Sequence, residues 1–188
     1  MSDPSFFISA DDLAARLGTP AWPQVIDVRA ASVRAVQPDL PASRWTDDPS
    51  GAVVARLVDL SRPVVIACKA GHNRSQRTAA ELRAMGIAAQ VLEGGSLAFA
   101  AADHPMLPRA SVDRWGGSGR VWVTRRRPKI DRVACPWLIR RFVDPAASFL
   151  FVDPDQVLAV AADVGGIAFD TPGAPIEHDG PRCSFDTL

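Results

Sequence analysis

The residues of this 188-residue chain that are best suited to chemistry lie between Cys68 and Ser75, where the sequence reads Cys-Lys-Ala-Gly-His-Asn-Arg-Ser. An apolar run at 63–67 precedes them, and a helical pattern over 76–85 follows. A strand that ends in a short loop before a helix directs backbone N–H groups and the positive end of the helix dipole at one point. Both effects favour a thiolate, so we expect a lowered pKa for Cys68. The pattern predicts a nucleophilic sulfur inside an anion-binding loop.

The other residues of this segment have predicted roles around the sulfur. Arg74, which five residues separate from Cys68, carries a planar set of donors suited to a tetrahedral oxyanion, and we expect it to act in catalysis with Cys68. Gly71 suits the positive φ of a tight loop, and Ser75 is expected to cap the helix or to hydrogen-bond the sulfur. The predicted substrate-binding residues are Lys69, Ala70, Gly71, His72, Asn73 and Ser75, of which Lys69 and His72 are expected to be exposed and to attract anions.

Alternating strands and helices are predicted for the first half of the chain, and they place this loop. A loop that leaves the carboxyl end of a central strand is where parallel sheets bind ligands, and alternation of the two element types favours such a sheet. Ser9 is the expected N-cap of the first helix. Strands are predicted at 25–28, 63–67 and 89–92, helices at 10–17, 74–85 and 96–102, and either type, with helix preferred, at 52–60.

Three segments of this half resemble the rhodanese-like family: Asp27-Val28-Arg29 at a strand end, the Cys68 loop, and Leu92-Glu93-Gly94-Gly95 before a helix. The resemblance covers about residues 5–108. It implies an α/β fold in which a five-stranded, mostly parallel sheet is flanked by helices. It also implies that Cys68 carries a persulfide sulfur from a small-molecule donor to a thiol acceptor, such as glutathione or a thioredoxin-like protein.

The length of the Cys68 loop departs from the rhodanese pattern. Sulfurtransferases of the family usually place four residues before the basic residue of the loop, whereas this chain has five. The longer loop resembles that of rhodanese-fold dual-specificity phosphatases and arsenate reductases, and it suits an entire oxyanion such as phosphate, arsenate or chromate.

Three functions therefore stay open, of which sulfurtransfer is preferred. The second is an oxyanion enzyme, either a phosphatase with His72 or Asp27 as general acid or a reductase. In a reductase, Cys135, Cys183 or glutathione would be the second thiol. The third is a non-catalytic oxyanion sensor.

A change in composition marks a domain boundary after this region. His104-Pro105, Pro108 and Gly116-Gly117-Ser118-Gly119 are typical of a linker. We predict one domain at 1–108, a linker at 109–120, and a smaller α/β or α+β domain at 121–188. Within the second domain, strands are expected at 121–123 and 148–152 and helices at 131–142 and 153–162, with Pro136 in the first turn of the former.

The second domain resembles the C-terminal domain of the chromate-resistance protein ChrB. The resemblance rests on Trp122-Val123-Thr124, on Arg127 to Phe142, on Phe169-Asp170 and on Cys183-Ser184-Phe185-Asp186. It covers about residues 119–188 and implies a link to chromate. The domain of that family continues beyond such a point, so a truncated domain is expected.

This domain contains two sets of residues whose side chains could bind a ligand. Glu177, His178, Cys183 and Asp186 offer imidazole, thiolate and carboxylate donors, but their spacing matches no zinc signature, so no metal and no cofactor are predicted. The basic run Arg125-Arg126-Arg127 with Lys129 could contact phosphates. Balanced net charge and the lack of a DNA-reading motif favour a solvated or ion-paired face, so a nucleic-acid partner is not expected. Cys135 is expected to be a packed helix residue.

Composition limits the class of protein. The chain is 47% hydrophobic and 22% charged with a formal net charge of 0, which is typical of a soluble globular protein. The N-terminal residues do not resemble a secretory signal, and no apolar run is long enough to span a membrane. Three widely spaced cysteines do not form a disulfide framework. These features favour the reducing cytoplasm, where a thiolate persists, and no membrane partner.

Overall fold

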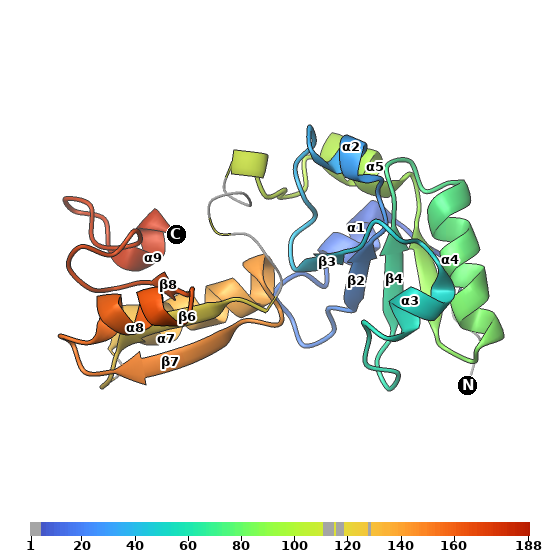
Figure 1. Ribbon diagram of the computed structural model, residues 1–188. Helices are drawn as coiled ribbons and strands as arrows, with labels where there is room; N and C mark the ends of the chain where they lie inside the picture. The colour runs from blue at the N-terminus through green and yellow to red at the C-terminus, as the bar shows by residue number, and fades with distance from the viewer. Residues whose placement is uncertain (1–4, 111–114, 116–118, 128) are drawn as a thin grey trace. The chain divides into compact units, whose positions relative to one another are not determined.

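The computed structural model describes residues 5–110, 115, 119–127 and 129–188. The chain divides into two units, Met1–Ser111 and Val112–Leu188 (Figure 1). The division falls inside the predicted linker at 109–120, and positions 111–114 and 116–118 of that segment lie outside the described residues.

The first unit contains the predicted five-stranded parallel sheet. Its strands follow the order β1-β5-β4-β2-β3, and neighbouring strands pair in parallel. The three longer strands match the predicted ones within one residue at each end, whereas the two short outer strands, of two and three residues, were not predicted. The strands are β1 Phe7–Ile8, β2 Gln24–Asp27, β3 Ser43–Trp45, β4 Val64–Ala67 and β5 Ala89–Leu92.

Helices connect these strands, and two of them end earlier than predicted. The Ser9 hydroxyl caps the first helix by accepting the Asp12 amide, as predicted. Beyond Ala14 and Ala55, backbone amides donate to the carbonyl three residues earlier, as in a 3₁₀-helix, and the α-helix ends there. No helix in the described part of the chain is long and apolar enough to cross a membrane. The helices are α1 Ala10–Ala14, α2 Ala31–Arg34, α3 Gly51–Ala55, α4 Asn73–Ala84 and α5 Gly95–Ala101.

Strand β4 is buried on both faces, and this burial makes it the centre of the unit. Val64 and Ile66 pack against residues of α3 and α4, while Val65 and Ala67 pack with residues of α1 and α5 on the other face. A strand that is covered on both faces needs a continuous apolar sequence, which 63–67 supplies. The carboxyl end of this strand is therefore a rigid point from which Cys68 begins.

A buried group of charges holds the segment after β2. Arg29 is almost completely buried and forms ion pairs with Asp27 and Asp39, both at 2.7 Å. Asp39 also contacts Arg34 at 2.6 Å and Arg109 at 3.1 Å. The Asp39 carboxylate thus contacts three guanidinium groups, and it joins the residues that follow α5 to the residues that follow β2.

The second unit is a smaller α/β fold, so the α/β alternative of the prediction is the one that holds. Its three strands are parallel in the order β7-β6-β8. Trp122 and Phe169 pack with Cys135 of α7 on one face, and Val123 packs with Val157 of α8 on the other. The elements are β6 Val121–Arg125, α7 Ile130–Leu138, the π-helix η1 Ile139–Val143, β7 Ser148–Val152, α8 Val157–Asp163, β8 Ile167–Ala168 and α9 Ser184–Thr187.

The predicted place of Pro136 was wrong. Helix α7 begins at Ile130, so Pro136 lies in its second half rather than in its first turn. Proline has no N–H to donate to the carbonyl four residues back, and the helix continues as the π-helix η1 shortly afterwards.

We expect Asp39→Ala to lower the free energy of unfolding by about 3 kcal/mol, because Arg29 would stay buried with half of its countercharge removed. Asp11→Ala is the matched control, since that carboxylate is 84% exposed and contacts His104 at the surface. The control should cost less than about 1 kcal/mol. Urea unfolding of both variants measures the difference, and equal losses would contradict a dominant role for the buried group.

Candidate active site

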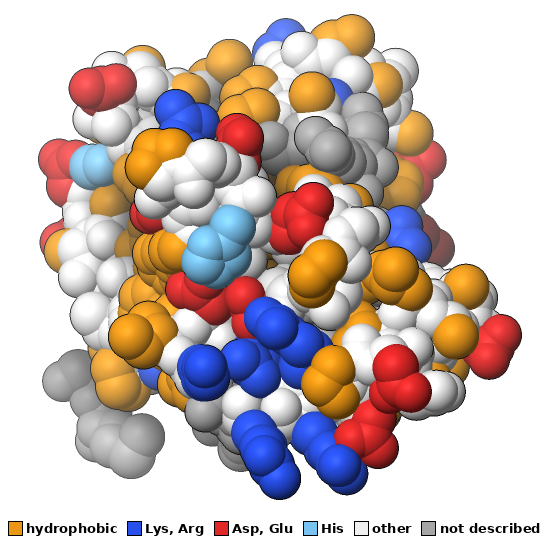
Figure 2. All heavy atoms as spheres, turned by 90° about the vertical axis from the view of Figure 1, so that its left-hand side faces the viewer, with side chains coloured by type: hydrophobic (Ala, Val, Ile, Leu, Met, Phe, Trp, Pro, Cys, Tyr) orange, Lys and Arg blue, Asp and Glu red, His pale blue; other side chains and the backbone are white. Residues whose placement is uncertain are grey.

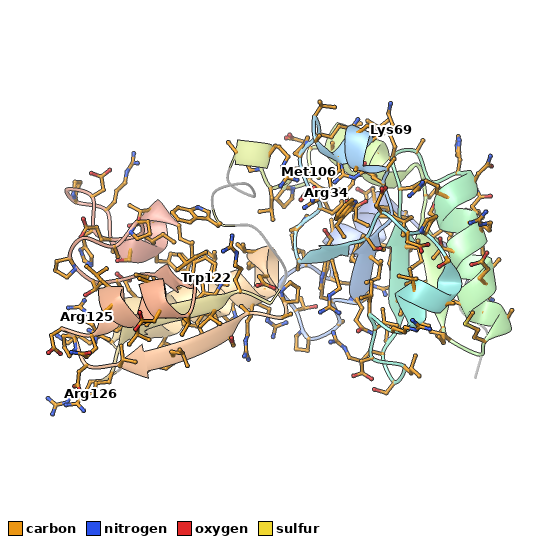
Figure 3. The ribbon with its side chains drawn as sticks, in the orientation of Figure 1. Arg34, Lys69, Met106, Trp122, Arg125 and Arg126 are labelled. Atoms are coloured by element: carbon orange, nitrogen blue, oxygen red, sulfur yellow. The ribbon has the colours of Figure 1, made fainter. Side chains whose placement is uncertain are left out.

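The structure has the strand–loop–helix arrangement that was predicted around Cys68. The loop leaves the carboxyl end of β4, and α4 begins at Asn73 after His72 as an extended N-cap. Cys68 is 7% exposed, Gly71 and Ser75 are buried, and Lys69, His72 and Asn73 are exposed. Lys69 lies at this end of the sheet in Figure 3.

Gly71 has the positive φ that was predicted, with a value of +70°. A Cβ atom at this position would lie 2.7 Å from the carbonyl oxygen of Leu92 and 2.8 Å from the amide nitrogen of Gly94. Gly95 also has a positive φ, and a Cβ there would lie 2.6 Å from the Gly71 nitrogen. The turn at 92–95 therefore packs directly against the Cys68 loop, and both sides of the contact require glycine.

Helix α5 fixes the backbone of the loop from the same side. The Ser96 amide donates to the Cys68 carbonyl at 2.9 Å, and the Leu97 amide donates to the Lys69 carbonyl at 3.1 Å. These are the first amides of α5, which have no partner inside their own helix. Because they hold the loop carbonyls outward, the loop amides are left to face the sulfur.

The sulfur of Cys68 lies among hydrogen-bond donors. Burial raises the pKa of Cys68, but the Ser75 hydroxyl and the amides of Ser75, Ala70 and His72 lower it by more, so the pKa lies below that of an ordinary thiol. The predicted direction of the shift is confirmed. The cause is the set of donors that stabilise the thiolate.

Ser75 couples the sulfur to the loop backbone. Its Oγ lies 3.1 Å from the Cys68 sulfur and 3.1 Å from the His72 carbonyl oxygen, to which it can donate. A hydroxyl has one hydrogen. When Cys68 is a thiol, Ser75 can accept from the sulfur and donate to the carbonyl, and when Cys68 is a thiolate, Ser75 can donate to the sulfur. The predicted hydrogen bond to the sulfur is thus present.

Arg74 is anchored to neighbouring loops. Its Nε donates to the Val28 carbonyl at 2.7 Å, and its Nη2 donates to the Asp47 carbonyl at 2.6 Å and lies 3.5 Å from the Asp47 carboxylate. These contacts tie the start of α4 to the residues after β2 and β3. Contact between Arg74 and an anion over Cys68 stays a prediction. The contacts of Arg74 with these carbonyls could not be predicted from the sequence, because every residue has a backbone carbonyl.

The structure removes one of the two candidate general acids. Asp27 is completely buried and accepts several hydrogen bonds from Arg29, so its carboxylate is committed to an ion pair. The proposal that Asp27 donates a proton to a leaving group was wrong. His72 is exposed at the loop and keeps that option.

The residues considered for a metal in the second unit do not form one group. Glu177 accepts the Gly173 amide at 2.9 Å, while Cys183 and Asp186 form a capping box at the start of α9. His178 lies instead beside Asp131 and Asp170, two residues that the spacing of the sequence did not connect to it.

The basic run in the second unit is partly ion-paired, as expected. Arg125 contacts Asp170 at 3.1 Å, and Arg126 forms an ion pair with Asp153. Figure 2 shows Lys and Arg side chains gathered on one face beside acidic side chains and a histidine, and Arg125 and Arg126 project from one end of this unit in Figure 3.

Cys135 is the packed helix residue that was predicted. It is completely buried in the core of the second unit. Burial and the negative charges of Asp131 and Asp170, with a smaller contribution from Cys183, raise the pKa of Cys135 to about 12. The thiol is therefore protonated and inert at neutral pH, which argues against a role as a resolving cysteine.

Comparisons with known proteins match the two units separately. The family model of the rhodanese-like domain matches residues 9–102, and that of the ChrB C-terminal domain matches residues 122–188. Protein ChrB of Cupriavidus metallidurans is 45% identical over 82 residues, which are 44% of this chain and 24% of that protein. The chain thus spans about a quarter of the length of this curated relative.

Solved structures resemble mainly the first unit. A rhodanese-related protein from Thermoplasma volcanium is 19% identical with a TM-score of 0.46, over 55% of this chain and 98% of that chain. A thiosulfate sulfurtransferase from Pseudomonas aeruginosa is 24% identical with a TM-score of 0.44, over 58% of this chain and 22% of that chain.

We expect the rate of alkylation of Cys68 by iodoacetamide to rise with pH through a midpoint below that of the same cysteine in the urea-unfolded chain. The sign follows from the lowered pKa, which leaves thiolate present at lower pH. Ser75→Ala should move the midpoint upward because it removes a donor to the thiolate. Site-resolved mass spectrometry measures the rate, and the buried Cys135 is an internal control that should stay unmodified. An unchanged midpoint in Ser75→Ala would contradict the assigned role of the hydroxyl.

We expect Gly95→Ala to destabilise the protein by about 2 kcal/mol or more and to slow the alkylation of Cys68, because the new methyl group would displace the loop. Gly86→Ala is the matched control, since Gly86 also has a positive φ but has open space around it. The control should cost only about 1 kcal/mol of backbone strain and leave alkylation unchanged. If Gly95→Ala and Gly86→Ala had equal stability and equal rates of Cys68 alkylation, the contact between the turn at 92–95 and the Cys68 loop would not matter for the site.

Proposed function

The chain belongs to the rhodanese-like family through residues 9–102, and we propose that it is a sulfurtransferase in which Cys68 carries the transferred sulfur as a persulfide. The observation that carries this proposal is the lowered pKa of a cysteine held by loop amides at the carboxyl end of β4. The match of residues 122–188 to the ChrB C-terminal domain supports a connection with chromate resistance.

The proposed reaction has two half-reactions. In the first, the Cys68 thiolate attacks the sulfane sulfur of a donor such as thiosulfate; the sulfur–sulfur bond of the donor breaks, and sulfite leaves with the electron pair. In the second, a thiolate acceptor or cyanide attacks the outer sulfur of the persulfide. The bond to Cys68 breaks, and the Cys68 thiolate returns.

The loop supplies charge stabilisation in both half-reactions. The amides of Ser75, Ala70 and His72 lower the pKa of Cys68, so they stabilise negative charge on the thiolate, and in the proposed reaction they would also stabilise charge on the persulfide. The exposed Lys69 adds a positive charge beside the sulfur, which favours anionic donors. Glutathione or a thioredoxin-like protein is the class of acceptor proposed.

A second candidate function, that of an oxyanion enzyme, is favoured by the length of the loop. Five residues between Cys68 and Arg74 leave room for a tetrahedral anion whose oxygens accept from the loop amides. A phosphatase would depend on His72 as general acid, because Asp27 is committed to Arg29. A reductase of arsenate or chromate would take its second thiol from Cys183 or from glutathione, because Cys135 is buried and protonated.

We expect the chain to transfer sulfur from thiosulfate to cyanide, with thiocyanate as the measured product. Cys68→Ser should lower the rate by at least about a thousandfold, since serine cannot form a persulfide. Cys183→Ser is the matched control and should keep the wild-type rate, because the proposed sulfurtransfer uses no second cysteine of the chain. Incubation with thiosulfate alone should increase the mass of the wild-type chain by one sulfur atom, and should not do so in Cys68→Ser.

Assays run in parallel separate the alternatives. Hydrolysis of aryl phosphates without sulfurtransfer would identify a phosphatase, and thiol-dependent loss of arsenate or chromate would identify a reductase. Tight binding of an oxyanion with no turnover would identify a sensor. Each of these results, if sulfurtransfer is absent, would refute the sulfurtransferase proposal.

A further inference from the structure

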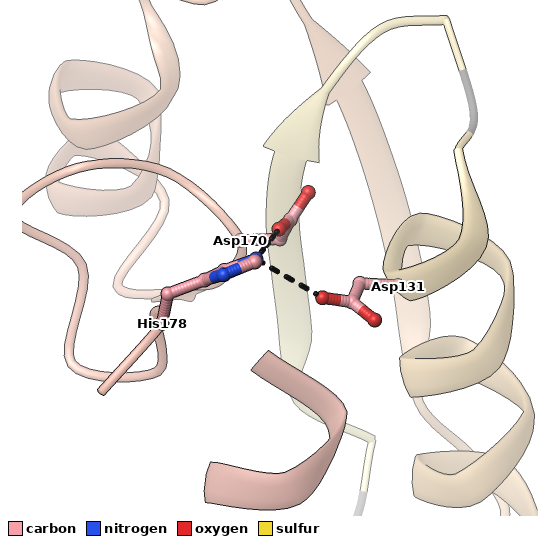
Figure 4. Close-up of side chains that lie close together, drawn as sticks. All are labelled: Asp131, Asp170 and His178. Carbon is pink, nitrogen blue, oxygen red and sulfur yellow. Dashed lines mark ion pairs between the residues drawn. The ribbon is translucent and has the colours of Figure 1, made fainter. Parts of the chain in front are cut away.

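Three potential metal ligands converge at the carboxyl edge of the second sheet. Asp170 follows β8, Asp131 lies in the first turn of α7, and His178 lies between β8 and α9. Their ligand atoms all lie within 4.8 Å of one another. The His178 Nε2 atom is 3.3 Å from Oδ2 of Asp131 and 3.8 Å from Oδ1 of Asp170. Figure 4 shows the imidazole directed at the two carboxylates.

Surrounding donors hold the two carboxylates in place. Arg125 and Arg132 both reach Oδ2 of Asp170, at 3.1 and 2.8 Å, which leaves Oδ1 on the side of His178. Ser184 donates its hydroxyl to Oδ1 of Asp170 and its amide to Oδ2 of Asp131, both at 3.1 Å. Hydrogen-bonded outer residues that fix the orientation of carboxylates are the usual surroundings of a metal site.

Burial adds a reason for a cation at this position. Asp131 is 9% exposed and Asp170 is 4% exposed. Asp170 has two arginine partners, whereas the ion pair that the structure gives Asp131 is with His178. A buried carboxylate is stable only when its charge is balanced. The His178 side chain is 64% exposed, so solvent and ions can reach the ligand atoms from that side.

We propose that Asp131, Asp170 and His178 bind one divalent transition-metal ion of the Zn²⁺ class. One imidazole nitrogen and two carboxylate oxygens suit such ions, and three protein ligands leave a coordination position for water. All three proposed ligands belong to the second unit, whereas Cys68 belongs to the first. The metal-site proposal can therefore be tested independently of sulfurtransfer.

Titration of the metal-free full-length chain, produced without a histidine tag, with Zn²⁺ tests the proposal. Calorimetry and elemental analysis after dialysis should give one Zn²⁺ per chain. His178→Ala and Asp131→Asn should each weaken binding by more than about tenfold, since each removes one ligand. Zn²⁺ should also raise the unfolding temperature of the wild type and raise it less in both variants. Circular dichroism verifies that the variants are folded.

Three control variants make the test specific. His104→Ala removes the matched histidine of the other unit, which lies 2.7 Å from Asp11, and should bind Zn²⁺ like the wild type. Cys68→Ser and Cys183→Ser should also keep wild-type affinity, because the proposed ligand set contains no thiolate. The proposal is overturned if the wild type binds no Zn²⁺, if His178→Ala binds equally well, or if a cysteine variant abolishes binding. In the first two cases, the three residues form only an ion pair.

Discussion

The direction of the backbone in the Cys68 loop depends on two hydrogen bonds from the start of α5. The amides of Ser96 and Leu97 donate to the carbonyls of Cys68 and Lys69, and Gly95 packs against Gly71 too closely for a side chain at either position. Because the carbonyls are fixed outward, the amides of Ala70, His72 and Ser75 are available to the sulfur. The reactivity of one cysteine thus follows from a contact with a turn that comes more than twenty residues later in the chain.

Both units place their charged or reactive groups at the same kind of position. In a parallel sheet, the chain leaves the carboxyl end of each strand toward a helix, so side chains from distant segments meet at that edge. The first unit presents a thiol there, after its most deeply buried strand. The second presents two carboxylates, a histidine and arginines at the corresponding edge. The two folds are alike in principle and differ in the chemistry that they can support.

Several features of this architecture could be predicted from the sequence because they depend on local residues. The apolar run at 63–67 is a buried strand, Gly71 has a positive φ, and Ser9 caps a helix. The short strands β1 and β3 could not be predicted, because two or three residues carry no periodicity. The pKa direction of Cys68 followed from the loop itself.

The contacts that join distant segments could not be predicted from the sequence. The anchors of Arg74 are backbone carbonyls, which every residue has, so the sequence could not indicate that this side chain is held by Val28 and Asp47. Asp131, Asp170 and His178 come from three separate elements, and their grouping depends on the packing of α7 against the sheet. The start of α7 was predicted within one residue, so the place of Pro136 was misjudged within the helix: six residues from the predicted start already exceed one turn.

The position of Ser75 determines how the site responds to a change of charge on the Cys68 sulfur. Its hydroxyl can turn between the His72 carbonyl and Cys68 by rotation about a single bond. This rotation moves a single hydrogen atom and leaves the heavy atoms of the buried side chain in place. The loop can therefore follow the gain or loss of charge on the sulfur without moving its backbone, and one backbone conformation suits both the thiol and the thiolate.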